Sequence, residues 1–395
     1  MVWLKLARLV AVPIAVVLAV GLTLVSPGAS ADEFYDISSV EIAGPPGSLV
    51  RLQGRPDIEV TRSYAWRILY RSVSFAGEPI VVSATVLVPF GAPPADGWPV
   101  IAWAHGTTGI VPKCGPTKLP DPLVRIVGIN QAITGRYVVV ATDYPGLGVG
   151  PAHPFLVGES EGRSILDSIR AVQAMPEAHA GRRTALFGFS QGGHAVLWAN
   201  QIAPHYAPEL DLIGVAALAP ATLLGELFTD DYDNLSGRIL TGLVLESWSD
   251  PNVYGLSIDS MIWPKEYAPF HKIGDNCIDL VQDEISDIAQ NRRIPKDFLK
   301  ADPATTPPWS RFMAENIPSW RHSAVPFYIG QGTADTTVDP PVTYKFIRRM
   351  CEEGTVVRLE KFPGKTHTKL PRAAQRSAME WIGDRFNGKP APNTC

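Results

Sequence analysis

The chain has 395 residues, of which 46% are hydrophobic and 19% are charged, as in an ordinary globular protein. Its formal net charge of -4 provides no basic field that would attract a polyanion, which argues against nucleic-acid binding. At the N-terminus, Lys5 and Arg8 precede an apolar run from Leu9 to Val25 and the small residues Ala29-Ser30-Ala31. This order is typical of a secretory signal peptide cleaved after Ala31. The alternative, an uncleaved membrane anchor, is disfavoured because the run is short for a bilayer span.

The next elements predict an α/β fold with a mostly parallel sheet flanked by helices. Residues 63–89 have the pattern of an antiparallel hairpin, with Gly77-Glu78 near its turn. Short apolar runs without alternation follow, as in parallel strands that are covered on both faces. These runs are Val100–Ala104, Tyr137–Ala141, Ala185–Phe187, Ile213–Ala216 and Val325–Ile329. Helical patterns such as Gly162 to Met175 lie between them, so we expect a ligand at the carboxyl ends of the strands.

The alternation of strand and helix stops between about Pro220 and about Trp320, although this interval is rich in apolar residues. A structureless loop of that size is not credible inside a compact domain. We therefore expect a mainly helical cap over residues 220–320, inserted before the strand at Val325–Ile329. The catalytic domain would then comprise residues 32–219 and 321–395, after a signal peptide over residues 1–31.

Ser190 is the candidate nucleophile, because Gly188-Phe189-Ser190-Gln191-Gly192 has the form Gly-x-Ser-x-Gly between a predicted strand and a predicted helix. Such a turn holds the serine in a strained conformation with small neighbours, and its hydroxyl projects from the top of the sheet. The pentapeptide alone is a weak signal, since a serine in a glycine turn is usually only a turn residue. The flanking elements and the partners described next favour catalysis.

A serine hydroxyl needs a base, and the base needs an acid that orients it. The last histidine, His367, follows a strand-like segment over residues 356–362. This position favours the role of general base for His367 over that of an ordinary histidine in a surface loop. Asp335 follows the strand at Val325–Ile329 within a turn of small residues and is the preferred acid. Asp339 is the competitor, but it precedes Pro340-Pro341 and is better suited to capping a helix.

Two backbone N–H groups are candidates for binding the oxyanion. Gln191, directly after the nucleophile, would supply one, and Thr107, in the His-Gly-rich loop after the strand at Val100–Ala104, would supply the other. The alternative for that loop is an ordinary turn. We expect His105 to be a structural residue rather than a second base. Asp143–Gly148 would shape the pocket wall or simply form a turn.

The four cysteines are Cys114, Cys277, Cys351 and Cys395. An even number in an exported chain indicates two disulfides, for which three connectivities are possible. Metal binding is the weaker interpretation, because the cysteines lack Cys-x-x-Cys spacing and histidines at zinc-ligand intervals.

With Ser190, Asp335 and His367 identified, the chain resembles the secretory lipase family of serine α/β hydrolases, which includes yeast lipase A. The resemblance covers essentially the whole mature chain and includes the long cap and the four cysteines. It implies the pairs Cys114–Cys277 and Cys351–Cys395, and action on triacylglycerols and other carboxylic esters without a metal or organic cofactor. At His105-Gly106 the chain departs from the yeast lipase A pattern, which carries an acidic residue near this loop.

The sequence therefore predicts a secreted esterase or lipase that forms an acyl-enzyme on Ser190, with an ester or lipid as its substrate. The apolar cap favours acyl chains and a transient contact with a lipid interface. Two alternatives remain open at this stage. One is an acyltransferase or peptidase with the same triad. The other is a catalytically inactive envelope-binding protein, against which the intact serine, aspartate and histidine argue.

Overall fold

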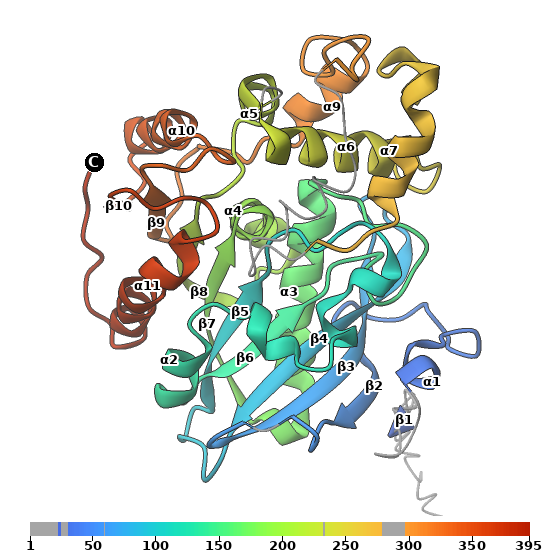
Figure 1. The fold of residues 1–395 in the computed structure, drawn as a ribbon. Coiled ribbons are helices and arrows are strands. Elements are labelled where there is room, and N and C mark those ends of the chain that lie inside the picture. The colour runs from blue at the N-terminus through green and yellow to red at the C-terminus, as the bar shows by residue number, and fades with distance from the viewer. Residues whose placement is uncertain (1–22, 25–30, 59, 232–233, 279–296) are drawn as a thin grey trace, which may run out of the picture.

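A computed structural model of the chain describes residues 23–24, 31–58, 60–231, 234–278 and 297–395 (Figure 1). Most of the predicted signal peptide, residues 1–31, lies outside the described residues. Its described part includes the two-residue strand β1 and the first residue of the short helix α1. Among the described residues, no helix combines the length and the apolar character that are needed to cross a membrane.

The core of the fold is one mixed sheet with the strand order β1-β2-β3-β4-β6-β5-β7-β8-β9-β10. The strands are β1 (Thr23–Leu24), β2 (Leu49–Gly54), β3 (Ser63–Val73), β4 (Pro79–Pro89), β5 (Trp98–Ala104), β6 (Val138–Thr142), β7 (Ala180–Phe189), β8 (Asp211–Leu218), β9 (Phe327–Gly332) and β10 (Val357–Phe362). The strands β2, β3, β4 and β6 pair antiparallel. From β6 to β10 every pairing is parallel, so the carboxyl ends of these strands meet at one edge.

Helices cover both faces of the sheet. They are α1 (Ala31–Tyr35), α2 (Ile129–Thr134), α3 (Gly158–Ala174), α4 (Gln191–Tyr206), α5 (Leu224–Asp231), α6 (Leu235–Ser249), α7 (Tyr267–Gly274), α9 (Trp309–Glu315), α10 (Pro340–Glu352) and α11 (Leu370–Phe386). The crossovers through α3 and α4 run along the sheet in the direction opposite to the crossover through α2. Because such crossovers are right-handed, α3 and α4 lie on one face and α2 on the other, where it contacts α11.

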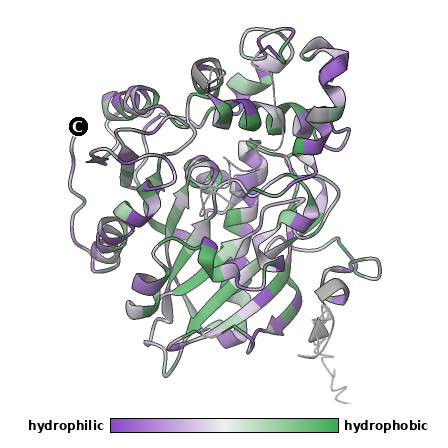
Figure 2. Ribbon diagram, viewed as in Figure 1, coloured by the Kyte–Doolittle hydropathy of each residue, from purple (hydrophilic) through white to green (hydrophobic). Residues whose placement is uncertain are grey.

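The parallel strands form the most apolar part of the molecule, as the hydrophobic colour of the sheet in Figure 2 shows. Nearly every residue of β5 is buried, and its Trp103 packs edge-on against Phe187 of β7, with ring centroids 5.0 Å apart. Burial on both faces explains why these strands appear in the sequence as continuous apolar runs rather than as alternating patterns.

The structure confirms the α/β-hydrolase architecture and the hairpin, since Ser63 pairs with Pro89 and Val73 with Pro79. The helix predicted from Gly162 begins four residues earlier, at Gly158. The strand β2 was not predicted, because its apolar residues are interrupted by Arg51 and Gln53.

Between β8 and β9 the chain forms the helices α5, α6, α7 and α9 and a bridge between Ile262 and Leu299. Figure 1 shows these helices as a layer beyond the carboxyl ends of the parallel strands. The layer has apolar contacts of its own, because Trp248 of α6 stacks on Trp309 of α9 with ring centroids 6.3 Å apart. The fold thus has a mainly helical insertion before the strand that leads to Asp335.

Candidate active site

The structure brings Ser190, His367 and Asp335 into one chain of hydrogen bonds. The Nε2 atom of His367 lies 2.9 Å from Ser190 Oγ, and the Nδ1 atom lies 2.8 Å from Asp335 Oδ2. All three side chains are buried. Since a carboxylate oxygen can only accept, Nδ1 carries the proton, and Nε2 is free to accept the proton of the serine. These contacts join residues that are 177 and 32 positions apart in the sequence.

The backbone around Ser190 has the strained turn that the sequence predicts. Ser190 lies between β7 and α4 with φ 57° and ψ -117°, a conformation that is rare for any residue except glycine. Its neighbours must be small. A Cβ on Gly188 would lie 2.1 Å from the carbonyl oxygen of Gly192, and a Cβ on Gly192 would lie 1.9 Å from that of Ala104. Both glycines are therefore required by the close packing of β5, β7 and α4.

Asp335 is fixed by its own turn. Its Oδ1 atom accepts hydrogen bonds from the backbone N–H groups of Thr337 at 2.9 Å and Val338 at 2.8 Å. The other oxygen, Oδ2, thereby faces His367. The competitor Asp339 occupies the N-cap position of α10, as expected, although its side chain makes no capping hydrogen bond.

The two residues predicted to bind the oxyanion lie beside Ser190. Thr107 and Gln191 line, together with Ser190, a cavity of about 30 Å³ that we call the small cavity. Apolar residues of α5 and α6 cover it, among them Leu227 and Leu240. This volume is small compared with the roughly 300 Å³ or more of an ordinary ligand pocket.

His105 and Asp143 are both buried. The ring of His105 contacts the carbonyl oxygens of Gly106 at 2.6 Å and Asp143 at 3.2 Å, and burial lowers its pKa to about 4. The Asp143 carboxyl accepts hydrogen bonds from Ser83 Oγ at 2.6 Å and from the Thr117 N–H at 3.0 Å, and burial raises its pKa to about 7. The structure thus gives His105 a structural position, while the side chain of Asp143 forms no part of the small cavity.

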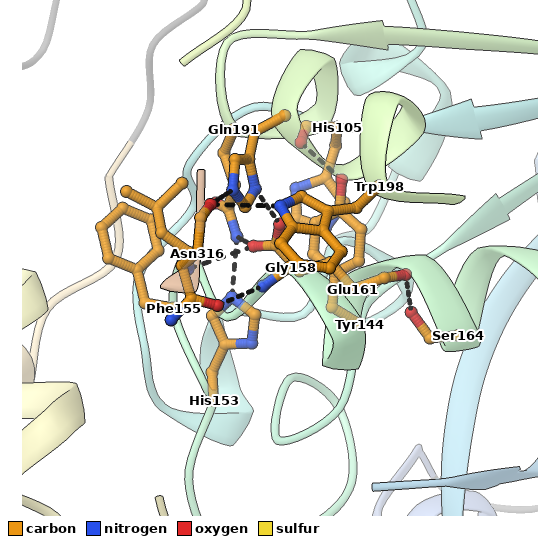
Figure 3. A network of polar contacts seen from close by, with 12 residues as sticks. His105, Tyr144, His153, Phe155, Gly158, Glu161, Ser164, Gln191, Trp198 and Asn316 are labelled. Carbon is orange, nitrogen blue, oxygen red and sulfur yellow. Dashed lines mark hydrogen bonds and ion pairs between the residues drawn. The ribbon is translucent and has the colours of Figure 1, made fainter. Parts of the chain in front are cut away.

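The side chain of Gln191 is held by a buried polar network, which Figure 3 shows. Its Nε2 atom lies 2.7 Å from Glu161 Oε1 and 2.8 Å from His153 Nε2. His153 donates from Nδ1 to the carbonyl oxygen of Pro145 at 2.8 Å, and burial lowers its pKa to about 3, so its Nε2 is an acceptor. Both amide hydrogens of Gln191 therefore have acceptors. Through this side chain the network fixes the residue that follows the nucleophile.

The other oxygen of Glu161 connects the network to the end of the insertion. Glu161 Oε2 lies 2.8 Å from His194 Nδ1, and His194 Nε2 lies 2.8 Å from the carbonyl oxygen of Asn316. Asn316 follows α9, and its side chain accepts a hydrogen bond from the N–H of Gly158 at 2.9 Å. Both nitrogens of His194 therefore face oxygen atoms, one of the Glu161 carboxylate and one of the Asn316 backbone. No local pattern in the sequence indicates the pair of Glu161 and His194, because its members lie 33 positions apart on separate helices.

Glu161→Ala is expected to lower the free energy of unfolding by about 3 to 5 kcal/mol, because it leaves His194 and the Gln191 amide buried without their acceptor. Glu161→Gln is expected to cost less than about 1.5 kcal/mol. Its amide oxygen can still accept from Gln191, and its NH₂ can donate to a neutral His194. Urea unfolding measures both values. The control is Glu159→Ala on the same helix, where a partly buried pair with Arg163 is lost at an expected cost of about 1 kcal/mol. Equal costs for alanine and glutamine at position 161 would contradict the network.

The cysteines form the pairs Cys114–Cys277 and Cys351–Cys395, the connectivity that the resemblance implies. The first bridge joins the segment after β5 to the segment after α7, and next to it the N–H of Ile278 donates to the carbonyl oxygen of Thr108 at 2.9 Å. The insertion is thus attached covalently to the loop that carries Thr107.

A cavity of about 1,090 Å³ lies away from Ser190. It is lined by the C-terminal half of α4 and by residues 319–325, and none of Ser190, Asp335 and His367 reaches it. A second cavity of about 630 Å³ adjoins the site and is lined by Thr107, Phe189 and the loop that carries His367.

The sequence is similar to those of known lipases. Lipase 6 of Candida albicans is 26% identical over 93% of this chain and 83% of its own length. A secreted triacylglycerol lipase of Malassezia globosa is 26% identical over 84% of this chain and 74% of its own length.

Two solved structures share the fold. Candida antarctica lipase A superposes with a TM-score of 0.73 at 19% identity, over 89% of this chain and 84% of its own. The rice cell wall degrading esterase LipA from Xanthomonas oryzae gives a TM-score of 0.71 at 19% identity, over 88% of this chain and 100% of its own. The profile of the family described as "Secretory lipase" matches residues 124–394, which is more than half of the sequence. The chain therefore belongs to the secretory lipase family of ester-cleaving α/β hydrolases.

Proposed function

We propose that this lipase cleaves carboxylic esters through an acyl-enzyme on Ser190. His367 would act as the general base and Asp335 as the residue that orients it. The observation that carries this proposal is the continuous hydrogen-bonded chain from Ser190 Oγ through His367 to Asp335. The backbone N–H groups of Gln191 and Thr107 would bind the oxyanion, and their position beside Ser190 on the small cavity supports that role.

In the first half of the reaction, His367 Nε2 takes the proton of Ser190 as Oγ attacks the ester carbonyl carbon. The bond between that carbon and the alcohol oxygen then breaks, and the imidazolium gives its proton to the departing alcohol. A water molecule repeats these steps on the acyl-enzyme and releases the carboxylic acid. Asp335 keeps the proton of His367 on Nδ1 and stabilises the imidazolium while it exists.

The insertion would act as a cap domain over residues 220–320, above a catalytic domain of residues 32–219 and 321–395. The small cavity of about 30 Å³ supports a cap that must move, because ligand pockets usually measure about 300 Å³ or more. Its apolar lining from α5 and α6 would face the acyl chain when the cap opens. Contact of these helices with a lipid interface would favour the open arrangement.

Membership of a secretory family indicates an extracellular location, and we propose that residues 1–31 are the signal peptide that directs export. The bound portion would be an acyl chain, and triacylglycerols are included among the substrates because the Malassezia globosa relative is named for them. The mechanism uses side chains and backbone N–H groups only, so it requires neither a metal nor an organic cofactor. With a net charge of -4, nucleic acid is not an expected partner.

The purified protein is expected to hydrolyse p-nitrophenyl esters of short and long acyl chains, and one equivalent of a fluorophosphonate should abolish this activity. Mass spectrometry of peptides should locate the label on Ser190. Activity that survives complete labelling of Ser190, or a label on another residue, contradicts the proposal. Product analysis with an added alcohol or amine distinguishes hydrolysis from acyl transfer, because a transferase yields the new ester or amide in place of the free acid.

A further inference from the structure

The cavity of about 630 Å³ beside the proposed active site is basic in character. Its lining includes Lys365, Lys369 and Arg372, whose side chains are exposed at the start of α11 and in the loop before it, together with Arg125. No aspartate or glutamate is among the described residues that line it. We call it the basic cavity. This cluster of positive charges contrasts with the net charge of the chain, which is -4.

The charges on one wall of the basic cavity are available to a ligand. Within the described residues, Lys365, Lys369 and Arg372 make no ion pair with a carboxylate. By contrast Arg376, one turn further along α11, lies 2.9 Å from Glu380 and does not line the cavity. Cationic groups at a concave surface attract anions more strongly than the same groups on a flat surface, because the low-dielectric walls focus the field.

The basic cavity lies on the side of the reaction centre from which the alcohol would leave. His367 must give its proton to the departing alcohol oxygen, so the alcohol lies against the loop that carries His367. Residues of that loop, Lys365 and Thr368, line the basic cavity but not the small cavity. Thr107, the proposed oxyanion donor, lines both. An ester carbonyl bound at Thr107 would therefore have its acyl chain toward α5 and α6 and its alcohol part toward the basic residues.

We propose that the basic cavity binds the alcohol part of ester substrates that carry an anionic group, a carboxylate or a phosphate, on that part. This inference rests on the proposed function, since it assumes that Ser190 attacks the ester beside Thr107. The anion would raise kcat/KM for such esters above that of neutral esters with the same acyl chain, because its attraction to the cavity persists until the alcohol departs.

The test uses butanoate esters of phenols that differ only in a meta substituent: carboxylate, phosphate, the neutral methyl ester of the carboxylate, and trimethylammonium. Each kcat/KM is divided by the rate constant for hydroxide-catalysed hydrolysis, which corrects for the leaving group. We expect the corrected kcat/KM of the carboxylate ester to exceed that of the neutral ester by roughly tenfold, and that of the trimethylammonium ester by a larger factor. The phosphate arm shows whether a second negative charge increases the preference. In 1 M salt, where the Debye length is about 3 Å, the preference should largely disappear.

A matched pair of variants links the preference to the cavity. Arg372→Glu and Arg376→Glu make the same change of charge one turn apart on α11, but only Arg372 lines the basic cavity. Arg372→Glu is expected to lower the ratio of anionic to neutral kcat/KM by about fivefold, and Lys369→Glu by a similar factor, whereas Arg376→Glu should leave the ratio within about 1.5-fold.

Three results would overturn the inference, and each is distinct from failure of the proposed function. In all of them the wild-type protein still hydrolyses the neutral ester. The first is equal corrected kcat/KM for anionic and neutral alcohols. The second concerns phenyl hydrogen adipate and phenyl methyl adipate, which carry a carboxylate or its neutral methyl ester on the acyl side. The inference fails if the charged adipate is preferred over the neutral one by the same factor as the anionic alcohols are preferred over the neutral alcohol. The third is a charge effect seen only with anionic lipid vesicles, which would assign the basic residues to a membrane surface instead. If no ester is hydrolysed at all, the proposed function itself fails.

Discussion

Replacing Ser190 with alanine is expected to lower kcat for ester hydrolysis by about 100,000-fold or more, while KM changes little. The hydroxyl is the group that would form the acyl bond, and His367 Nε2 lies 2.9 Å from its oxygen. The residual rate reflects only the oxyanion donors acting on water. Initial rates with p-nitrophenyl butanoate, together with titration of active sites by fluorophosphonate in the wild type, provide the measurement.

The control for this variant is Ser168→Ala, a buried serine of α3 whose hydroxyl donates only to the carbonyl oxygen of Ile165, at 2.7 Å. Like Ser190→Ala, it removes one buried hydroxyl group, but at a position outside the proposed active site. It should leave kcat within about twofold of the wild type. Both variants should unfold with a single transition, which shows that they are folded. If Ser190→Ala keeps a tenth of the wild-type kcat, another group is the nucleophile.

The sequence predicts the elements whose signal lies in consecutive residues. The apolar runs of β5, β6 and β7 are continuous because both faces of these strands are buried, and the turn at Ser190 needs its two glycines for steric reasons. The chain order of serine, acid and histidine in this fold then limits the choice to the loops after β9 and β10. For these reasons the residues that meet at Ser190 could be named before their distances were known.

Features that depend on long-range contacts could not be predicted in this way. Glu161 and His194 occupy ordinary helical positions in the sequence, and only the packing of α3 against α4 brings them together. The strand β2 was missed for a related reason. Its Gln53 looks like a surface residue, but it is buried and accepts a hydrogen bond from Arg67 of β3.

The basic cavity is a further example. It combines Arg125, from the segment before α2, with Lys369 at the start of α11. Lys369 belongs to a stretch from Lys361 to Arg376 in which every charged residue is basic, but charge patterning gives no sign that Arg125 lies beside it. The proximity of these residues arises because α2 and α11 contact each other on the same face of the sheet.

Asp335→Asn is expected to lower kcat by about 10,000-fold at neutral pH, with little loss of stability. The structure determines how the new amide would lie. The position of Oδ1 accepts hydrogen bonds from Thr337 and Val338, so it must hold the amide oxygen, and the NH₂ group then faces His367 Nδ1. A donor at that point forces the proton of the imidazole onto Nε2, where it blocks acceptance of the Ser190 proton. Steady-state kinetics of the variant test this explanation, because the loss of the general base should lower kcat and leave KM nearly unchanged.

Asp339→Asn is the matched control, because it makes the same change four residues later, at the N-cap of α10. Its kcat should stay within about threefold of the wild type, since asparagine is also a good N-cap residue. The pair of variants also decides between the two acids that the sequence leaves in competition. A large loss of kcat in Asp339→Asn with normal activity in Asp335→Asn would transfer the orienting role to Asp339. A large loss in both would mean that the turn from residue 335 to residue 339 acts as one unit, in which the position of Asp335 depends on the start of α10.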